Sequence, residues 1–179
     1  MFCKLLATAV AILVCAAAPA AADHIPGRPC GDCASHEHWP TIGGTIEKAQ
    51  FRSTVLRGTA RSDELLGHHG SDRLYGEGRS DVLWGDWQGG DQPTSQRDRI
   101  YGGSGGDFIY GSHGRNVVFG GPGNDAISVH FGRGYVDCGR GRDLYHVAKS
   151  RRRGYTFRNC ERVDYRSEAQ RGGGLRPLG

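Results

Sequence analysis

A nine-residue repeat constrains the fold of this chain more than any other feature of its sequence. The repeat runs from Gly58 to His146, about half of the 179 residues. Two of its clearest units read Gly-Gly-Ser-Gly-Gly-Asp-Phe-Ile-Tyr, from Gly102, and Gly-Gly-Pro-Gly-Asn-Asp-Ala-Ile-Ser, from Gly120. A short and fixed period predicts a solenoid, because each repeat can bury its apolar side chain only by stacking on its neighbours.

The eighth position of every unit is apolar or aromatic, although only 37% of the chain is hydrophobic. One inward residue in each short strand suits a thin parallel coil, and positions seven and nine then face outward because side chains alternate along a strand. The glycines in the first half of each unit permit the positive φ angles of tight turns. The eighth positions are Leu65, Leu74, Leu83, Ile100, Ile109, Val118, Ile127, Val136 and Tyr145.

The sixth position of nearly every unit is aspartate, and the turns that carry it fall on two edges. If two units form one coil, alternate units share an edge. An insertion from about Asp86 to Pro93 lengthens the turn that leads to Asp98. One edge then stacks Asp63, Asp81, Asp107, Asp125 and Asp143, and the other stacks Asp72, Asp98, Asn116 and Gly134.

These units resemble the nonapeptide of RTX (haemolysin-type) calcium-binding proteins, Gly-Gly-x-Gly-x-Asp-x-apolar-x. The resemblance covers residues 58–146, and the units at Gly102 and Gly120 match it at every defined position. It implies an all-β fold, a right-handed parallel β-roll, in which two units form a coil and calcium lies between stacked turns. It also implies that the ligands are the position-six carboxylates and the carbonyl oxygens of the turns.

We expect calcium on the first edge, whose aspartate ladder is unbroken, and weak or absent sites on the second. Asp107 with Asp125 is the best pair, because both of their turns keep the glycines, and Asp125 with Asp143 is next. Arg61 and Arg79 replace a glycine of the motif, which weakens the case for a site between Asp63 and Asp81. The residues predicted to bind calcium are Asp63, Asp81, Asp107, Asp125, Asp143, Gly103, Gly105, Gly121 and Gly123. The alternative is a roll that folds without metal, with aspartates that only form turns.

The parts outside the repeat predict an exported protein. Residues 1–22 read as a signal peptide, with Lys4 before an apolar run and small residues at the cleavage site. No later segment is long and apolar enough to span a membrane. We divide the rest into an N-terminal cap (23–57), the roll (58–146) and a basic C-terminal cap and tail (147–179). Residues 139–179 carry 11 Lys or Arg against 4 Asp or Glu, whereas residues 23–138 are acidic overall.

Four cysteines remain after the signal peptide is removed: Cys30, Cys33, Cys138 and Cys160. An even number in an exported chain predicts two disulfides, and four cysteines allow three pairings. We favour Cys138 with Cys160, which would attach the C-terminal cap to the last coil, and Cys30 with Cys33. A transition-metal cluster of Cys30 and Cys33 with the nearby histidines is the alternative, although its spacing is shorter than that of usual zinc motifs.

Aromatic residues at position nine gather on both faces of the predicted roll. Tyr75, Tyr101 and Phe119 lie on one face, flanked by Arg73 and Arg99, and a second group with Trp84, Phe108 and Tyr110 lies on the other. Such rows stiffen a sheet or mark a contact surface for a sugar or a protein.

The sequence therefore predicts a secreted calcium-binding protein with a structural or surface-interaction role, whose partners are calcium ions. The alternative is a carbohydrate- or protein-binding module on a calcium-stabilised scaffold, with an extracellular glycan or protein as its partner. We expect no enzyme and no nucleic-acid partner. The flanks are too short for a catalytic domain, and the Gly-x-Ser-x-Gly pattern at Gly102–Gly106 lies in a repeat turn without the strand-to-helix context of a nucleophile.

Overall fold

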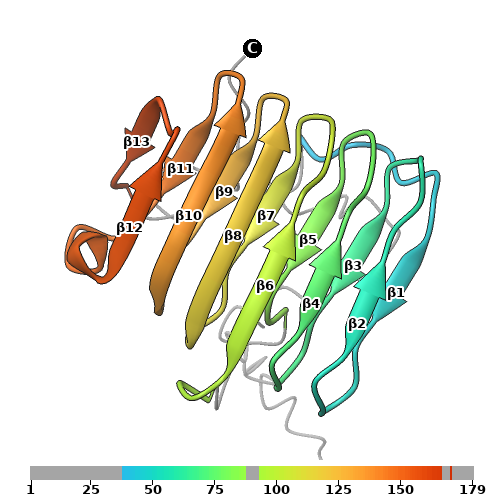
Figure 1. Cartoon of the computed structure of the whole chain (residues 1–179), viewed down its shortest axis with the longest axis horizontal. Helices are drawn as coiled ribbons and strands as arrows, with labels where there is room; N and C mark the ends of the chain where they lie inside the picture. Colours follow the sequence, from blue (N-terminus) through green and yellow to red (C-terminus); the bar gives the residue numbers. More distant parts are fainter. Residues whose placement is uncertain (1–37, 88–92, 167–169, 171–179) are drawn as a thin grey trace, which may run out of the picture.

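The structure is a computed structural model that describes residues 38–87, 93–166 and 170. Parallel strands form an all-β solenoid of about six turns, which confirms the predicted fold class (Figure 1). The odd sheet contains β1 (Ile46–Lys48), β3 (Glu64–Leu66), β5 (Val82–Trp84), β7 (Phe108–Tyr110), β9 (Ala126–Ser128), β11 (Leu144–His146) and β13 (Arg162–Asp164). The even sheet contains β2 (Val55–Arg57), β4 (Arg73–Tyr75), β6 (Arg97–Tyr101), β8 (Arg115–Pro122), β10 (Arg133–Arg140) and β12 (Tyr155–Arg158), which follows the 3₁₀ turn η1 (Arg152–Gly154).

The core is the space between the two sheets, and the eighth position of each unit fills it as predicted. Eight of these side chains are 0% exposed, and Tyr145 is 6% exposed. Burial of one such aliphatic side chain contributes about 1.5–3 kcal/mol, and a three-residue strand gains this only through its stacked neighbours. At the C-terminal end Phe157 closes the core, with its ring 4.2 Å from that of Tyr145. At the N-terminal end Glu47 occupies the register position of Leu65, so the inward column ends in a carboxylate.

The insertion changes the length of one coil without changing its register. The backbone N–H of Asp72 donates to a carboxylate that lies 26 residues further along the chain, and so does that of Asp81. Elsewhere on the first edge the interval is 18 residues. The eight additional residues are therefore accommodated in one loop, and the aspartates keep the two edges that the sequence predicts.

The outer faces of the two sheets differ, which the alternating pattern does not predict. On the even sheet, positions seven and nine are exposed or half-buried. On the odd sheet, all three residues of β3, β7, β9 and β11 are buried. Trp39 and Ile42 pack on this face, and the Trp39 indole N–H donates to the Tyr110 hydroxyl over 3.0 Å. On the odd sheet, side chains that point away from the core are therefore buried and not exposed to solvent.

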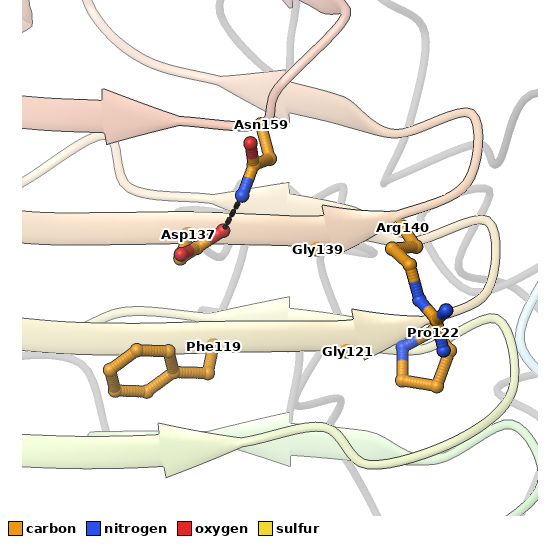
Figure 2. Close-up of a pocket in the computed structure, with 7 residues that line it drawn as sticks. All are labelled: Phe119, Gly121, Pro122, Asp137, Gly139, Arg140 and Asn159. Carbon is orange, nitrogen blue, oxygen red and sulfur yellow. Dashed lines mark hydrogen bonds between the residues drawn. The ribbon is translucent and has the colours of Figure 1, made fainter.

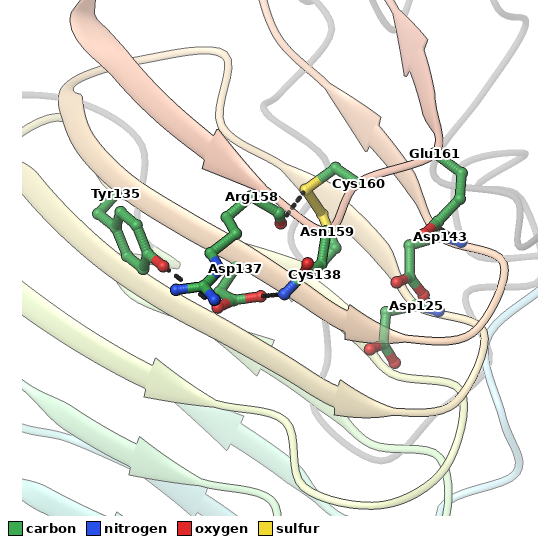
Figure 3. Close-up of a disulfide and its surroundings, with 9 residues drawn as sticks. All are labelled: Asp125, Tyr135, Asp137, Cys138, Asp143, Arg158, Asn159, Cys160 and Glu161. Atoms are coloured by element: carbon green, nitrogen blue, oxygen red, sulfur yellow. Dashed lines mark hydrogen bonds between the residues drawn. A yellow bond between two sulfur atoms is a disulfide. The ribbon is translucent and has the colours of Figure 1, made fainter.

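Cys138 and Cys160 form a disulfide that links β10 to the segment after β12 (Figure 3), the pairing favoured from the sequence. The bond closes a loop with a sequence separation of 22 residues. In the chain-entropy model a loop of this length stabilises the folded state by about 3 kcal/mol. We expect the Cys138→Ser/Cys160→Ser double variant to lose about this much free energy of unfolding. Urea denaturation in calcium measures it, and an unchanged midpoint would show that the cap stays in place without the bond.

Several predictions fall outside the part of the chain that the structure describes. The signal peptide, Cys30 and Cys33 are among them, and the proposed domain boundaries remain predictions. Within the described residues, the stacked strands extend beyond the repeat on both sides, from Ile46 to Asp164. No helix in that part of the chain has the length and apolar character needed to cross a membrane.

Candidate metal sites

The first edge is a continuous ladder of carboxylates joined by hydrogen bonds that all run in one direction. Each aspartate accepts, through Oδ1, the backbone N–H of the equivalent residue one coil earlier. The N···O distances are 2.7 Å from Asp63 to Asp81, 2.9 Å from Asp81 to Asp107, and 2.8 Å for each of the next two rungs. The structure therefore brings together all five predicted aspartates on one line, and all five are 0% exposed.

The second carboxylate oxygen, Oδ2, has no hydrogen-bond partner in four of these five aspartates: Asp81, Asp107, Asp125 and Asp143. Such a buried and unpaired charged oxygen is costly, because it has lost water and gained no donor. A cation supplies the missing partner, so these four oxygens fit the metal that the repeat implies.

The same four aspartates follow turns with one shared backbone conformation. In each of these turns, two alternate residues before the aspartate have positive φ. They are Glu77 and Arg79, Gly103 and Gly105, Gly121 and Gly123, and Gly139 and Gly141. The turn before Asp63 lacks such residues. Positive φ at Glu77 (76°) and Arg79 (69°) costs roughly 1–2 kcal/mol per residue. Arg79 therefore adopts the positive φ of the glycine that it replaces, although its side chain disfavours that conformation. Arg61 replaces the same glycine but does not have a positive φ.

Main-chain carbonyl oxygens lie close to the unpaired carboxylate oxygens. A Cβ at Gly102 would contact both Oδ2 of Asp107 and the carbonyl oxygen of Gly120, and a Cβ at Gly120 would contact Oδ2 of Asp125 and the carbonyl oxygen of Cys138. Among the described residues, no three His, Cys, Asp or Glu side chains form a metal-binding group. Calcium takes six to eight oxygens and accepts backbone carbonyls, so a site here combines carboxylates with these carbonyls.

Burial changes the proton affinity of the ladder. It raises the pKa of Asp107 to about 8, and the hydrogen bond from the Asp81 backbone N–H only partly opposes this. Burial likewise raises the pKa of Asp81 and Asp125 to about 7, and that of Asp143 to about 6. Without a cation, Asp81, Asp107 and Asp125 therefore hold protons for much of the time near neutral pH, and Asp143 does so only at lower pH.

Asp63 differs from the other rungs, although the sequence groups it with them. The Thr59 backbone N–H donates to its Oδ2 over 2.6 Å, and the Thr59 hydroxyl lies 3.1 Å from both carboxylate oxygens. Its Oδ1 accepts the backbone N–H of Thr45. With both oxygens satisfied inside the protein, Asp63 has less to gain from a cation.

Glu161 extends the ladder by one rung beyond the repeat, and the repeat pattern does not predict it. Its Oε2 accepts the backbone N–H of Asp143 over 2.8 Å, and Figure 3 shows Asp125, Asp143 and Glu161 on successive coils. Glu161 stands 18 residues after Asp143, and this spacing is the one signal that the sequence offers for it. The glycines of the repeat are absent around it, although Val163 keeps the apolar eighth position opposite Tyr145.

The second edge satisfies most of its own polar groups. Asp72 accepts backbone N–H groups from Thr54 and His68 over 2.8 and 2.9 Å. The Asn116 side chain bonds Ser112 and the Tyr155 hydroxyl. In this part of the described structure, buried carboxylate oxygens without a partner remain only on Asp98, through Oδ2, and on Asp86 in the inserted loop, through Oδ1. The second edge therefore has fewer buried carboxylate oxygens without a partner than the first edge, and its predicted lack of strong calcium sites stays a prediction.

The glycines of the first edge permit a close approach between coils that a side chain would block. Gly105 has φ of 127°, and an added Cβ would overlap the Arg79 carbonyl of the coil below. We expect Gly105→Ala to lower the free energy of unfolding by at least about 1–2 kcal/mol, the cost of the backbone conformation alone. Gly43→Ala is the matched control, since nothing lies within 4 Å of its added Cβ. Equal urea midpoints for the two variants would contradict the tight stacking.

Comparison with known families agrees with this geometry. Residues 53–83, 70–88 and 94–127 match the family model described as RTX calcium-binding nonapeptide repeat (4 copies). Comparisons with curated proteins and with solved structures give no match. The matched residues include the turns of Asp81, Asp107 and Asp125, and the cofactor of this family is calcium. Residues 53–88 and 94–127 of the solenoid therefore match the RTX calcium-binding nonapeptide repeat, the family that the sequence resembles.

Proposed function

We propose that this chain is a secreted calcium-binding β-roll with a non-catalytic, structural or surface-interaction role, and that its ions lie between successive turns of the first edge. Three inter-turn sites follow, between Asp81 and Asp107, between Asp107 and Asp125, and between Asp125 and Asp143. Asp63 is not part of this set. The turn glycines Gly103, Gly105, Gly121 and Gly123 contribute the backbone conformation of these sites and their carbonyl groups.

The observation that carries the proposal is the coincidence of two independent features. The aspartates whose Oδ2 has no partner are the same ones whose turns contain paired positive-φ residues. A turn-forming role alone does not require unpaired oxygens, because Thr59 shows how a side chain in this position can satisfy the carboxylate. Bound calcium supplies divalent positive charge, and these carboxylates and carbonyls hold it between coils.

Secretion is supported by the predicted signal peptide and by the disulfide, since disulfides persist in oxidising compartments. Extracellular calcium modules typically bind with dissociation constants of roughly 10⁻⁴ to 10⁻³ M. Ions held at such affinities stay bound outside a cell and are lost inside it. The roll is therefore proposed to gain its full stability only after export.

Isothermal titration of calcium into chelated, signal-free protein tests the proposal. We expect about three ions with affinities in the extracellular range, together with a gain of β-sheet circular dichroism, because metal binding is coupled to folding when the site does not pre-exist. Titration with magnesium is the control, since that ion demands a smaller octahedral site. Absence of heat, with an unchanged spectrum after chelation, would remove the proposal.

A further inference from the structure

The outer face of the even sheet contains a strip that is formed by the two longest strands of the roll. Strands β8 and β10 have eight residues each, whereas the other strands have three to five. They pair in register from Arg115 opposite Arg133 to Pro122 opposite Arg140. At the rise of an extended strand the strip is about 23 Å long. No other described strands pair over so many residues.

One end of the strip is strongly basic. Arg97, Arg115 and Arg133 lie opposite one another on β6, β8 and β10 and form a column across the strands. All three are exposed, and none forms an ion pair within the described part of the chain. Like charges about 4.8 Å apart in neighbouring strands repel one another unless an anion lies between them. The column therefore fits a ligand with more than one anionic group.

The other end of the strip is a depression of about 390 Å³ where a column of aromatic rings ends. Tyr75, Tyr101 and Phe119 stack on one another, with centroids 4.8 and 5.2 Å apart and planes within 7°. On the next strand the column continues with Asp137 instead of a ring. Phe119 is thus the last ring of the parallel stack and borders the depression, and the tilted ring of Tyr135 lies 5.9 Å from the Phe119 ring.

Polar groups of several kinds surround this depression (Figure 2). Its floor is the backbone at Gly121 and Gly139. Asp137 lies on one side and accepts hydrogen bonds from the Asn159 side-chain amide, over 2.8 Å, and from the Tyr135 hydroxyl, over 3.1 Å. Arg140 lies at the other side. These groups suit a polyhydroxylated ring that also carries an anionic group. The carboxylate accepts hydrogen bonds from hydroxyl groups, and the guanidinium donates to the anion.

We propose that this strip binds an acidic oligosaccharide, with one sugar ring in the depression and anionic groups on Arg140 at one end and on Arg115 and Arg133 at the other. Nucleic acid fits less well for two reasons. A nucleic-acid backbone has few hydroxyl groups to donate to the Asp137 carboxylate, whereas a sugar ring has several. The stacked rings also turn most of their faces toward one another, so they cannot serve as platforms for bases. The proposal goes beyond calcium binding, and it rests on the proposed function in one respect, because the turn residues Gly121 and Gly139 form the floor of the depression and also belong to the turns of the proposed calcium sites.

Binding of a short oligogalacturonate to the calcium-loaded, signal-free protein tests this inference by calorimetry. We expect binding that weakens as salt screens the charges, and little binding of the uncharged galactose oligomer of the same length. Arg115→Gln/Arg133→Gln and Arg140→Gln should each lower the affinity at least tenfold. The control variant Lys149→Gln/Arg162→Gln removes the same number of positive charges from outside the strip, and it should leave the affinity unchanged.

Circular dichroism and calcium stoichiometry are measured on every variant, so that a folding defect or a lost ion is separated from a lost ligand. The inference is overturned if the galacturonate does not bind to protein with a full calcium complement. It is also overturned if the arginine variants bind as the control does, or if oligo-dT or anionic vesicles compete as the stronger ligand.

Discussion

Calcium-free protein is expected to be more stable at pH 5 than at pH 8, and calcium should reverse this order. Burial raises the pKa of Asp107 to about 8, of Asp81 and Asp125 to about 7, and of Asp143 to about 6, against an ordinary value of 3.8. The folded state therefore binds more protons than the unfolded state between about pH 4 and pH 8. Stability that these groups contribute is fully present below pH 3.8 and is lost as the pH rises through 6 to 8.

The expected loss of stability is large even when only part of each pKa shift is converted into free energy. One pKa unit corresponds to 1.36 kcal/mol, so the loss of a single unit at each of four carboxyls amounts to about 5 kcal/mol. Whole domains are stable by about 5–15 kcal/mol. We therefore expect the chelated protein to be largely unfolded at pH 8 and to regain β structure on acidification to pH 5.

Bound calcium takes the place of the protons, so the loaded protein should be stable at pH 8 and should lose affinity for calcium as the pH falls below 6. Urea denaturation at both pH values, with chelator and with millimolar calcium, measures all four states. Equal stability of the chelated protein at pH 5 and pH 8 would contradict this prediction. It would show that the ladder carboxylates have water or hydrogen-bond donors that stabilise their charged form.

Asp107→Asn should have the largest effect of any single substitution on calcium binding. Asp107 stands between Asp81 and Asp125, so it takes part in two of the three proposed sites. The amide keeps an oxygen that can accept the Asp81 N–H but removes the negative charge. We expect the bound calcium to fall by about two ions and the thermal midpoint in calcium to fall toward that of the chelated protein, as measured by equilibrium dialysis and calorimetry.

The same substitution should stabilise the chelated protein at pH 8, by about 1–3 kcal/mol, because it replaces a buried unpaired charge with an amide that can donate to a nearby carbonyl. This opposite sign separates a metal ligand from an ordinary structural residue. Asp63→Asn is the matched control, since Thr59 already satisfies that carboxylate, and it should retain the calcium stoichiometry. A similar loss of ions in both variants would contradict the proposed arrangement.

The sequence predicts the coil well because a fixed period determines both pitch and register. One inward residue per unit identifies the core from Leu65 to Tyr145, and the spacing of aspartates assigns each to an edge. The insertion near Asp86 does not disturb this, since a loop can lengthen while its ends stay in register. The first-edge ladder therefore follows from the amino-acid sequence alone.

Features that depend on contacts outside the period could not be predicted in this way. The Thr59 backbone N–H and hydroxyl satisfy Asp63 through a local turn that the other first-edge aspartates lack. Glu161 joins the ladder from a segment that lacks the glycines of the repeat. Trp39 packs on the outer face of the odd sheet from an irregular segment, so the burial of that face has no trace in the alternating pattern. The long strip on β8 and β10 likewise depends on how far two neighbouring strands keep pairing.

Glu47 has a consequence for how this molecule behaves in a crowded solution. A parallel stack has no natural length limit, because its last strand offers the next copy the same unpaired N–H and C=O groups that its own strands use. Where Leu65 continues the hydrophobic column, Glu47 presents a carboxylate to any copy that arrives end to end. Fibre growth from that end would require desolvating this charge, so Glu47 opposes end-to-end association there.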